Sequence, residues 1–342
     1  MTEKETLYGK NPEELAALCA ELGLPRFAAR QIARWLYVRG TEDPMRMTDL
    51  AATARKRLAA RFAPALSAPE RVSVSADGTK KYLFRTRHGH YVESAYIPDG
   101  DRATLCVSSQ AGCRMGCRFC ATGRQGLQES LPAAEILNQI VSLPERDRLT
   151  NLVFMGMGEP LDNPDQLLRT LSVITSEWGF GWSPTRVTVS TAGVVPQLRR
   201  FLDATKVHLA VSLHNPFREE RMEIMPVERA WPIAEVAAIL RGYDFTHQRR
   251  VSFEYIVLEG LNDSPRHIRG LSRLLDGIKC RINLIRFHRI PGSPYFSPDD
   301  EAMRRFRDAL TARGIQTTIR ASRGEDIQAA CGLLSTEALG GR

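Results

Sequence analysis

The segment TLCVSSQAGCRMGCRFCATG, residues 104–123, carries three cysteines in CxxxCxxC spacing directly after an apolar, strand-like run. These are Cys113, Cys117 and Cys120, and a fourth, Cys106, lies seven positions upstream of Cys113. Four thiolates close a structural zinc site or a fully ligated iron–sulfur cluster. Three thiolates leave one iron of a four-iron cluster without a protein ligand, so that it is free to bind a substrate or cofactor. A zinc site completed by a distant cysteine or histidine is the alternative.

From residue 102 onward, strand-like and helix-like segments alternate. Repeated βα units predict an α/β fold with a parallel sheet and right-handed crossovers. Six or seven such units, with polar residues at the strand ends, predict a partial or full TIM-type (β/α) barrel over residues 99–320. A doubly wound open sheet is the alternative. The predicted strands are TLCVSS, NLVFMG, RVTVST, VHLAVSL, VSFEYIVL, INLIRF and TTIRAS. The predicted helices include LPAAEILNQIVSL, PDQLLRTLSVITSEW, IAEVAAILRGY, PRHIRGLSRLLDGI and DDEAMRRFRDAL.

The regions that flank this core have other patterns. Residues 1–68 predict a helical domain, because NPEELAALCAELG begins with a capping signal and RFAARQIARWLYVRG carries a helical apolar stripe. Residues 70–98 alternate polar and apolar positions around Asp-Gly and His-Gly turns, which predicts short antiparallel strands. Residues 321–342 end in LGGR and are expected to be loosely held apart from DIQAACGLL. The side chains expected in the core of the helical domain are Phe27, Ile32, Trp35 and Leu36.

Composition and charge indicate a cytoplasmic protein with a polyanionic partner. The chain has 342 residues, a net charge of +8, seven cysteines, no secretory signal and no apolar run near ~18 residues. Residues 26–61 hold nine Lys/Arg and three acids, a local charge of +6. Arg26, Arg30 and Arg34 recur every four residues and would line one helix face. This face is either solvated or contacts phosphates.

The cluster loop resembles that of the radical S-adenosylmethionine (SAM) superfamily. In that superfamily the open iron binds the amino and carboxylate groups of SAM, and an electron cleaves SAM to a 5′-deoxyadenosyl radical. GMGEP, residues 156–160, resembles the superfamily's SAM amino-group motif, with Glu159 as the acceptor. STAGVVP and VSLHNP also fall at strand ends, where barrel sites form. Read alone, Ser190, Ser212 and His214 would be ordinary strand-end polar residues.

The match narrows to the RlmN/Cfr family of radical-SAM RNA adenine methyltransferases, which the chain resembles from about residue 10 to residue 335. The helical FAARQIARWLY resembles the RNA-binding domain of that family. The segment IRF stands where the family more often has IPF or IPW, which suggests a divergent subgroup. The motifs that carry the resemblance are ATLCVSSQAGCRMGCRFCATG, FMGMGEPL, STAGVVP, FEYIVLEGLND, INLI, IPGSPY and RGEDIQAACGLL.

This resemblance implies a radical route, because an adenine ring carbon is too poor a nucleophile to attack the methyl group of SAM. In the family one SAM methylates a cysteine, and a second SAM supplies the radical that takes hydrogen from that methyl group. The methylene radical adds to adenine, and a second cysteine resolves the adduct as a disulfide. Cys331 matches the methyl carrier, Cys106 the resolving cysteine and Glu93 the proton acceptor. Cys331 and Cys106 must therefore meet, so the C-terminal segment is expected to fold back over the barrel mouth.

The resemblance also implies the cofactors: one [4Fe–4S] cluster per chain on Cys113, Cys117 and Cys120, and two SAM molecules per turnover. His288 stands where the family usually has Asn, and is retained as a SAM ligand because histidine also forms hydrogen bonds. The complete set of SAM-binding positions is Gly158, Glu159, Ser190, Ser212, Leu213, His214 and His288.

The expected reaction is methylation of adenine C2 in 23S rRNA and possibly tRNA, with C8 methylation as the alternative. An electron donor such as flavodoxin or ferredoxin is expected, with no membrane partner and a monomeric state. Two further function classes remain open. A radical-SAM enzyme for a small molecule or peptide would not need the basic N-terminal region. A non-catalytic RNA-binding protein with a structural metal would not need GMGEP.

Overall fold

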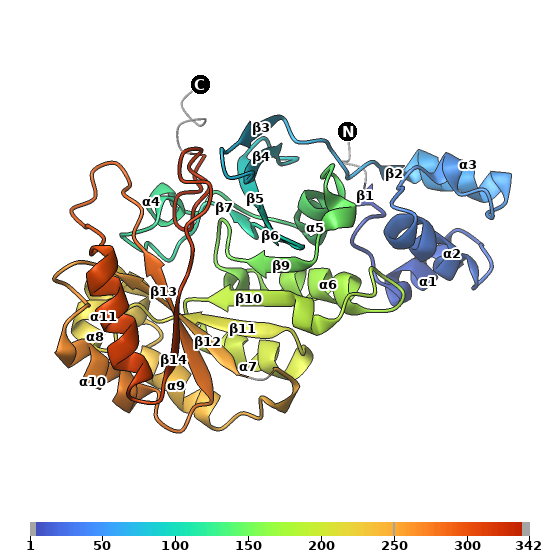
Figure 1. Cartoon of the computed structure of the whole chain (residues 1–342). Coiled ribbons are helices and arrows are strands. Elements are labelled where there is room, and N and C mark those ends of the chain that lie inside the picture. Colours follow the sequence, from blue (N-terminus) through green and yellow to red (C-terminus); the bar gives the residue numbers. More distant parts are fainter. Residues whose placement is uncertain (1–4, 249, 337–342) are drawn as a thin grey trace.

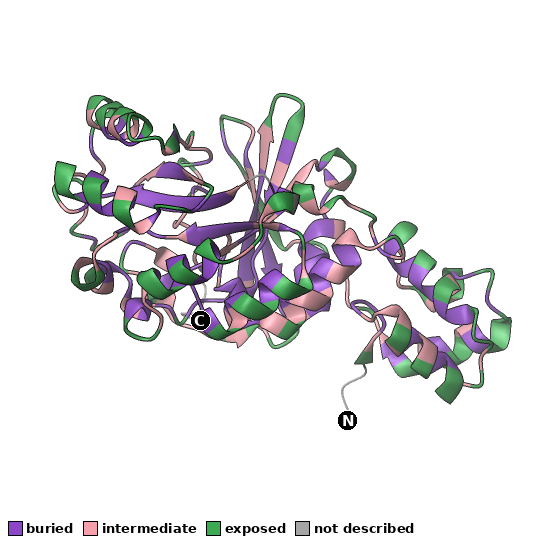
Figure 2. Ribbon diagram, turned by 90° about the horizontal axis from the view of Figure 1, so that it is seen from below, coloured by how far each residue is buried: buried purple, intermediate pink, exposed green. Residues whose placement is uncertain are grey.

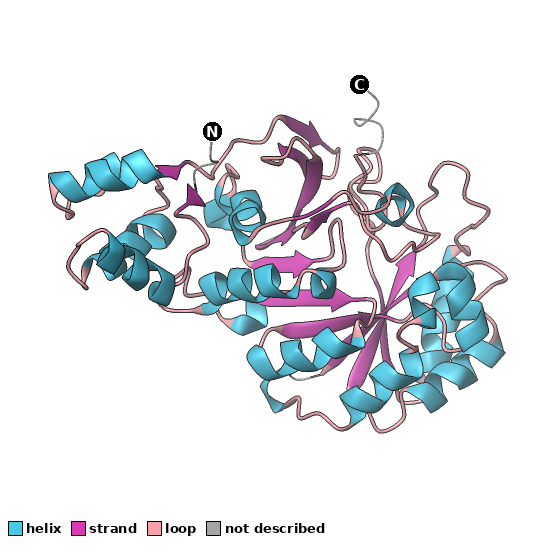
Figure 3. Ribbon diagram, turned by 180° about the vertical axis from the view of Figure 1, so that it is seen from behind, coloured by secondary structure: helices cyan, strands magenta, loops and turns pink. Residues whose placement is uncertain are grey.

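The computed structural model describes residues 5–248 and 250–336. A helical N-terminal part, blue in Figure 1, stands beside a larger part built on a ten-stranded sheet. The central strands of this sheet are buried, whereas the outward faces of the helices are exposed (Figure 2). The helices gather on the outer side of the curved sheet (Figure 3).

Seven parallel strands follow one another across the sheet in chain order. A doubly wound sheet would reverse this order at a switch point, so the structure is of the barrel type. The barrel is partial: β14 forms one edge of the sheet, and β6 pairs on its outer side with an antiparallel strand. All seven predicted strands are confirmed: β6 (Arg102–Cys106), β9 (Asn151–Phe154), β10 (Val187–Thr191), β11 (His208–Ser212), β12 (Val251–Val257), β13 (Cys280–Arg286) and β14 (Gln316–Ile319).

The connecting helices pack apolar stripes against the sheet. In α11, for example, the Asp299 side chain caps the first turn by accepting from the Ala302 N–H (2.7 Å), and Met303, Phe306 and Leu310 are buried at helical spacing. The five predicted helices are α5 (Ala133–Val141), α6 (Pro164–Thr175), α9 (Ile233–Arg241), α10 (Pro265–Leu274) and α11 (Asp300–Thr311). Two helices were not predicted from the sequence: α7 (Val195–Ala204), which begins within STAGVVP, and α8 (Arg218–Ile224), which follows VSLHNP.

Residues 70–98 form antiparallel strands as predicted, namely β3 (Arg71–Val74), β4 (Lys80–Arg85) and β5 (Tyr91–Asp99). They extend the barrel sheet itself, because β5 pairs antiparallel with β6. In this register Ala95 lies opposite Cys106. Glu93 is two residues before Ala95 and therefore points to the same face of the sheet.

The N-terminal part contains α1 (Pro12–Glu21), α2 (Ala28–Ala33), the π-helical turn η1 (Arg34–Val38) and α3 (Ala52–Arg61). The predicted core residues Ile32, Trp35 and Leu36 are buried. The prediction for Phe27 was wrong: its side chain is 63% exposed, because it lies at the position that precedes α2 and not on the buried stripe. A short parallel pair, β1 (Glu5–Thr6) with β2 (Phe62–Ala63), joins the two ends of this part.

The C-terminal segment folds back over the barrel mouth, as expected. The Thr122 hydroxyl donates to the Leu334 carbonyl (2.6 Å), and the Ser335 N–H donates to Glu93 (3.1 Å). Ala329, Ala330 and Leu334 are buried by this docking. The terminal LGGR lies outside the described residues.

Short elements complete the described chain: β7 (Gln110–Ala111), β8 (Glu129–Ser130), α4 (Ala121–Gln125) and the 3₁₀ turns η2 (Pro44–Arg46), η3 (Arg146–Arg148), η4 (Pro160–Asp162), η5 (Pro184–Arg186), η6 (Pro226–Arg229) and η7 (Thr246–Gln248). The longest described helices, α6 and α11, have 12 residues each. Within residues 5–248 and 250–336, therefore, none has the length and apolarity that a membrane span requires.

A buried ion pair fastens the carboxyl ends of β10 and β11. Arg221, on α8, pairs with Glu228 and is fully buried with it. Its guanidinium also donates to the Leu213 (2.8 Å), Ser212 (2.9 Å) and Ala192 (3.0 Å) carbonyls. These carbonyls belong to the turns that end the two strands, so Arg221 sets where those turns lie.

We expect the Arg221→Met substitution to lower the free energy of unfolding by about 3–5 kcal/mol, because it leaves Glu228 buried without its cation. Urea unfolding monitored by circular dichroism measures this loss. The control is Arg305→Met, which removes an exposed pair with Glu301 on α11 and is expected to cost less than about 1 kcal/mol. Equal losses in the two variants would contradict the role given to the buried pair.

Candidate active site

A cavity opens at the carboxyl ends of the parallel strands, where barrel enzymes build their sites. Residues from each of the seven parallel strands, or from the segment that follows the strand, line this cavity. They include Cys113, Cys117, Phe119, Cys120, Gly158, Glu159, Ser190, Ser212, His214, Glu254, Arg320 and Cys331. Residues far apart in sequence therefore share one space.

The cluster loop owes its shape to glycine. Gly112 has φ +75°, and a Cβ there would lie 1.7 Å from the Gly126 carbonyl oxygen, so no other residue fits without moving the backbone. A Cβ on Gly123 would lie 2.9 Å from the Cys117 nitrogen. This close packing of backbone on backbone turns Cys113, Cys117 and Cys120 onto the same cavity wall.

The three thiols fit a cluster that lies between them. Burial raises the pKa of Cys113 to about 12, and burial together with the neighbouring thiols raises the pKa of Cys117 and Cys120. Iron would compensate the negative charge of their thiolates. Within the described part of the chain no three His, Cys, Asp or Glu side chains converge closely enough to hold one metal ion. The three cysteines line the same cavity.

Glu159 differs from the other buried glutamates. Glu93, Glu145, Glu228 and Glu254 each form an ion pair with Lys or Arg, whereas no ion pair of Glu159 occurs among the described residues. Glu159 accepts hydrogen bonds from the Thr191 hydroxyl (2.6 Å) and from two backbone N–H groups. Burial still raises its pKa to about 7. A carboxylate offers about four acceptor positions, so one remains for a cationic ligand such as an ammonium group.

Polar side chains from the next two strands complete this wall. Ser190 and Ser212 line the cavity from β10 and β11, and His214 follows β11. The edge of the Phe119 ring packs on the His214 ring, with centroids 4.8 Å apart. Burial lowers the pKa of His214 to about 3, so the ring is neutral at physiological pH. The Leu213 side chain is buried in the core and does not line the cavity.

Cys106 and Cys331 meet in a second cavity that adjoins the first. Both cysteines line it, and it shares Cys120, Arg320 and Cys331 with the first cavity. Burial, with a smaller contribution from Cys331, raises the pKa of Cys106 to about 12. His288 also lines this second cavity and contacts Ser322 (3.2 Å). His288 thus shares the second cavity with Cys106 and Cys331, and it does not line the first cavity, which holds Glu159 and Ser190.

Arg320 and Glu254 were not predicted from the sequence; Arg320 lines both cavities and Glu254 lines the first. Arg320 follows β14, and its guanidinium lies 3.4 Å from the Glu254 carboxylate and 3.4 Å from the Met155 sulfur. The Coulombic interaction with Cys331 raises the pKa of Arg320, and the charge of Arg320 opposes the larger effect by which burial raises the pKa of Cys106. A Glu inside the apolar VSFEYIV and an Arg at the end of TTIR were the signals that could have identified them.

Glu93 lies on β5, two residues before the Ala95 that pairs with Cys106, and it lines neither cavity. It is 2% exposed, pairs with Lys81 (3.0 Å) and is covered by Ser335 of the C-terminal segment. Burial raises the pKa of Glu93, and the positive charge of Lys81 opposes this shift. A carboxylate with a raised pKa is better suited to accept a proton near neutral pH.

The chain is similar to several known proteins. The family model "Radical SAM superfamily" matches residues 107–270, and the model "Ribosomal RNA large subunit methyltransferase N-terminal domain" matches residues 6–63. A "Probable dual-specificity RNA methyltransferase RlmN" from Parabacteroides distasonis is 54% identical over 98% of this chain and 98% of its own length. A "Dual-specificity RNA methyltransferase RlmN" from Anaeromyxobacter dehalogenans is 45% identical, covering 95% of this chain and 90% of its own. The crystal structure of a radical SAM methyltransferase from Sphaerobacter thermophilus superimposes with a TM-score of 0.89, at 42% identity over 96% of this chain and 99% of that one.

If Glu93 accepts a proton, single-turnover methylation of RNA should be lost as the pH falls through its pKa. The rate is expected to fall at a pH above about 4.3, the ordinary pKa of glutamate, because burial raises the pKa of Glu93. Lys81→Met removes the cation that lowers this pKa, so the fall in rate should occur at a still higher pH. Glu93→Gln should abolish the step at every pH. An unchanged pH dependence of the rate in Lys81→Met would contradict the assignment of Glu93 as the proton acceptor.

Proposed function

This chain belongs to the RlmN family of radical-SAM RNA methyltransferases, and from that premise we propose that it methylates C2 of an adenine in 23S rRNA and in tRNA. The methyl group would pass through Cys331, with Cys106 as the resolving cysteine. The observation that carries this proposal is the meeting of Cys331 and Cys106 in a cavity that adjoins the cluster loop. A radical-SAM enzyme that acts without a carrier thiol has no need for this pair.

The proposed cofactor sites follow from the cavity walls. Cys113, Cys117 and Cys120 would hold a [4Fe–4S] cluster, whose role with SAM is to supply a carbon-centred radical. Glu159 would accept from the ammonium group of SAM, and Gly158, Ser190, Ser212, Leu213 and His214 would complete its site. His288 would reach SAM from the second cavity. A Cβ on Gly158 would lie 2.6 Å from Gln110, so glycine is needed there for the close approach of neighbouring backbone.

The chain's own residues would perform the remaining steps. Cys331 lines both cavities, so it would receive a methyl group in the first and meet the adenine in the second. Cys106 must attack as a thiolate to release the product, and the positive charge of Arg320 opposes the effect by which burial raises its pKa. Glu93 would accept the proton from the methylated ring carbon. The docked C-terminal segment keeps water away from these groups.

The N-terminal part is the proposed RNA-binding surface. Arg26, Arg30 and Arg34 are exposed, and the exposed ring of Phe27 lies among them in the sequence. Other basic residues of this part are tied to the protein: Arg61 pairs with Glu21, and Arg57 donates to the Leu22 carbonyl. A cationic stripe with one aromatic ring suits a phosphate backbone with an unpaired base. The target adenine would leave its stack to reach the second cavity.

The remaining parts of the proposal concern partners and place. A small electron-transfer protein such as flavodoxin or ferredoxin would reduce the cluster, and the enzyme would act as a monomer. It would act in the cytoplasm, since rRNA and tRNA are processed there. C8 methylation by the same residues is the competing reaction, and mass spectrometry of nucleosides from a deletion strain distinguishes the two products.

The two cysteines predict two different mutant phenotypes. Cys331→Ala removes the methyl carrier, so neither a protein-bound methyl group nor methylated RNA should form. Cys106→Ala keeps the carrier but cannot resolve the adduct, so a covalent protein–RNA species should accumulate. Denaturing gel electrophoresis with labelled RNA measures both outcomes.

Cys280→Ala is the matched control, because Cys280 lies on β13 away from both cavities and should behave as the wild type. Multiple-turnover methylation by Cys331→Ala would refute the carrier role. The absence of a trapped adduct in Cys106→Ala would refute the resolving role.

The basic stripe predicts salt-dependent RNA binding. Neutral replacement of Arg26, Arg30 and Arg34 by Gln should weaken RNA binding and reduce the slope of log K against log salt by about two to three, roughly one for each lost phosphate contact. Binding isotherms at several salt concentrations measure the slope. SAM cleavage without RNA should be unchanged. Replacing the exposed Arg305 on α11 is the control, and an equal loss there would make the stripe an ordinary solvated face.

A further inference from the structure

His214 holds an uncommon backbone conformation at the edge of the first cavity. Its φ is +58°, one of two positive values for residues other than glycine in the described chain. Residues other than glycine are uncommon in this left-handed region, although histidine adopts it more readily than most, so the surrounding contacts help to hold His214 there. His214 follows the carboxyl end of β11 and lines the cavity beside Phe119. The contacts that hold this conformation therefore also help to set where the His214 ring lies in the cavity.

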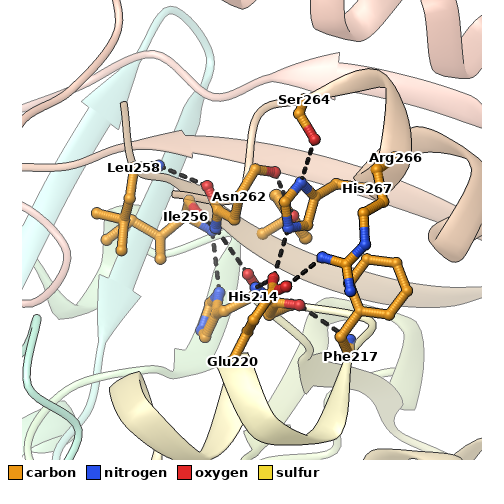
Figure 4. Close-up of polar contacts among 11 residues, drawn as sticks. His214, Phe217, Glu220, Ile256, Leu258, Asn262, Ser264, Arg266 and His267 are labelled. Carbon is orange, nitrogen blue, oxygen red and sulfur yellow. Dashed lines mark hydrogen bonds and ion pairs between the residues drawn. The ribbon is translucent and has the colours of Figure 1, made fainter. Parts of the chain in front are cut away.

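Asn262 imposes it from behind the cavity wall. This fully buried residue lies in the connection between β12 and α10 (Figure 4). Its side-chain amide donates to the His214 carbonyl (2.7 Å) and to the Ile256 carbonyl (2.8 Å), while its oxygen accepts from the Leu258 N–H (2.7 Å). Both amide hydrogens and the amide oxygen are thus engaged. Asn262 binds the end of β12 and the turn after β11 to each other.

The same arrangement fixes which nitrogen of His214 carries the proton. The Nδ1 atom of His214 accepts from the Ile256 N–H (2.9 Å), and a backbone N–H can only donate. In a neutral ring the proton must then be on Nε2. No partner for Nε2 occurs among the described residues of the protein. His214 therefore has one N–H donor left for a ligand in the cavity.

A second network holds the next residue without reaching the cavity. The Asn215 amide donates to Glu220 (3.0 Å), and Glu220 contacts Arg266 and His267 of α10 (Figure 4). None of these residues lines either cavity. This network stabilises the same turn, so it offers a matched control for effects on stability alone.

We propose that Asn262 is a positioning residue that directs the Nε2–H of His214 to an acceptor atom of bound SAM. SAM offers such acceptors in its carboxylate, its ribose hydroxyls and its adenine ring nitrogens. The inference rests on the proposed function only in that the cavity binds SAM, and it requires nothing of the RNA. In this proposal Asn262 does not contact SAM itself, and it increases the affinity for SAM by positioning His214.

Equilibrium dialysis of SAM against the cluster-loaded, unreduced protein tests the proposal. His214→Asn keeps a residue that tolerates positive φ and an amide oxygen for the Ile256 N–H, but it removes the Nε2–H. Asn262→Ser removes the amide that fixes the turn. Each substitution is expected to raise the dissociation constant for SAM about tenfold, which corresponds to ~1.4 kcal/mol. Because both act on one hydrogen bond, the double variant should bind SAM no more weakly than His214→Asn alone.

Glu220→Gln is the control: it disrupts the outer network, and its dissociation constant for SAM should stay within about twofold of the wild type. Iron content and urea unfolding identify any variant that has lost its fold, and if Asn262→Ser is such a variant, Asn262→Asp replaces it, because it keeps the oxygen that accepts from the Leu258 N–H and loses the amide donor. Unchanged affinity in His214→Asn, or additive losses in the double variant, would overturn the proposal. A wild-type protein that binds SAM but does not methylate RNA would refute the proposed function and leave this inference standing.

Discussion

The Gly332 carbonyl accepts a hydrogen bond from the Ala121 N–H (2.8 Å), and through this contact the C-terminal segment closes on the loop that carries Cys120. Gly332 has φ +83°, and a Cβ there would lie 3.4 Å from the Phe119 carbonyl, so the approach is tight. The neighbouring Thr122 hydroxyl binds the Leu334 carbonyl in the same docking. Only this closure brings Cys331, near the end of the chain, to Cys106 on the first barrel strand. Both cavities are bounded by it, so the chemistry proposed for the thiols depends on it.

Closing a site in this way removes water from charged groups, and the structure compensates nearly all of them in pairs. Lys81 lies beside Glu93, Arg221 beside Glu228 and Arg320 beside Glu254. A buried charge that loses its partner costs several kcal/mol, so these pairs limit how the site can be altered. They also place cations where thiols and carboxylates must change protonation. Arg320 shows this most directly, because it lowers the pKa of Cys106 against the effect of burial.

Much of this architecture could be predicted from the sequence, and the reasons for the failures are physical. The strands of the barrel are apolar runs of the right length, and CxxxCxxC is a spacing that few other folds require. Phe27 was assigned to the core because it continues an apolar stripe, but the helix begins only after it, and periodicity does not locate helix ends. The residues Arg320, Glu254 and Asn262 were missed because each acquires its role from contacts between distant strands. Glu93 was identified by resemblance alone, since a single carboxylate in an alternating strand carries no signal of burial.

The two cavities differ in charge, and this difference suits SAM in the first cavity and RNA in the second. SAM is cationic at its sulfonium and ammonium groups, and the first cavity offers Glu159, whose carboxylate has no cation partner among the described residues. RNA is a polyanion, and the second cavity is lined by Arg286, Arg323 and His288 in addition to Arg320. Arg286 and Arg323 each pair with an exposed aspartate, Asp300 and Asp99, so their charge remains accessible to a phosphate that displaces a solvated partner. Cys331 lines both cavities, between the unpaired carboxylate of the first and the additional cations of the second, and this position suits the methyl-carrier role proposed for it.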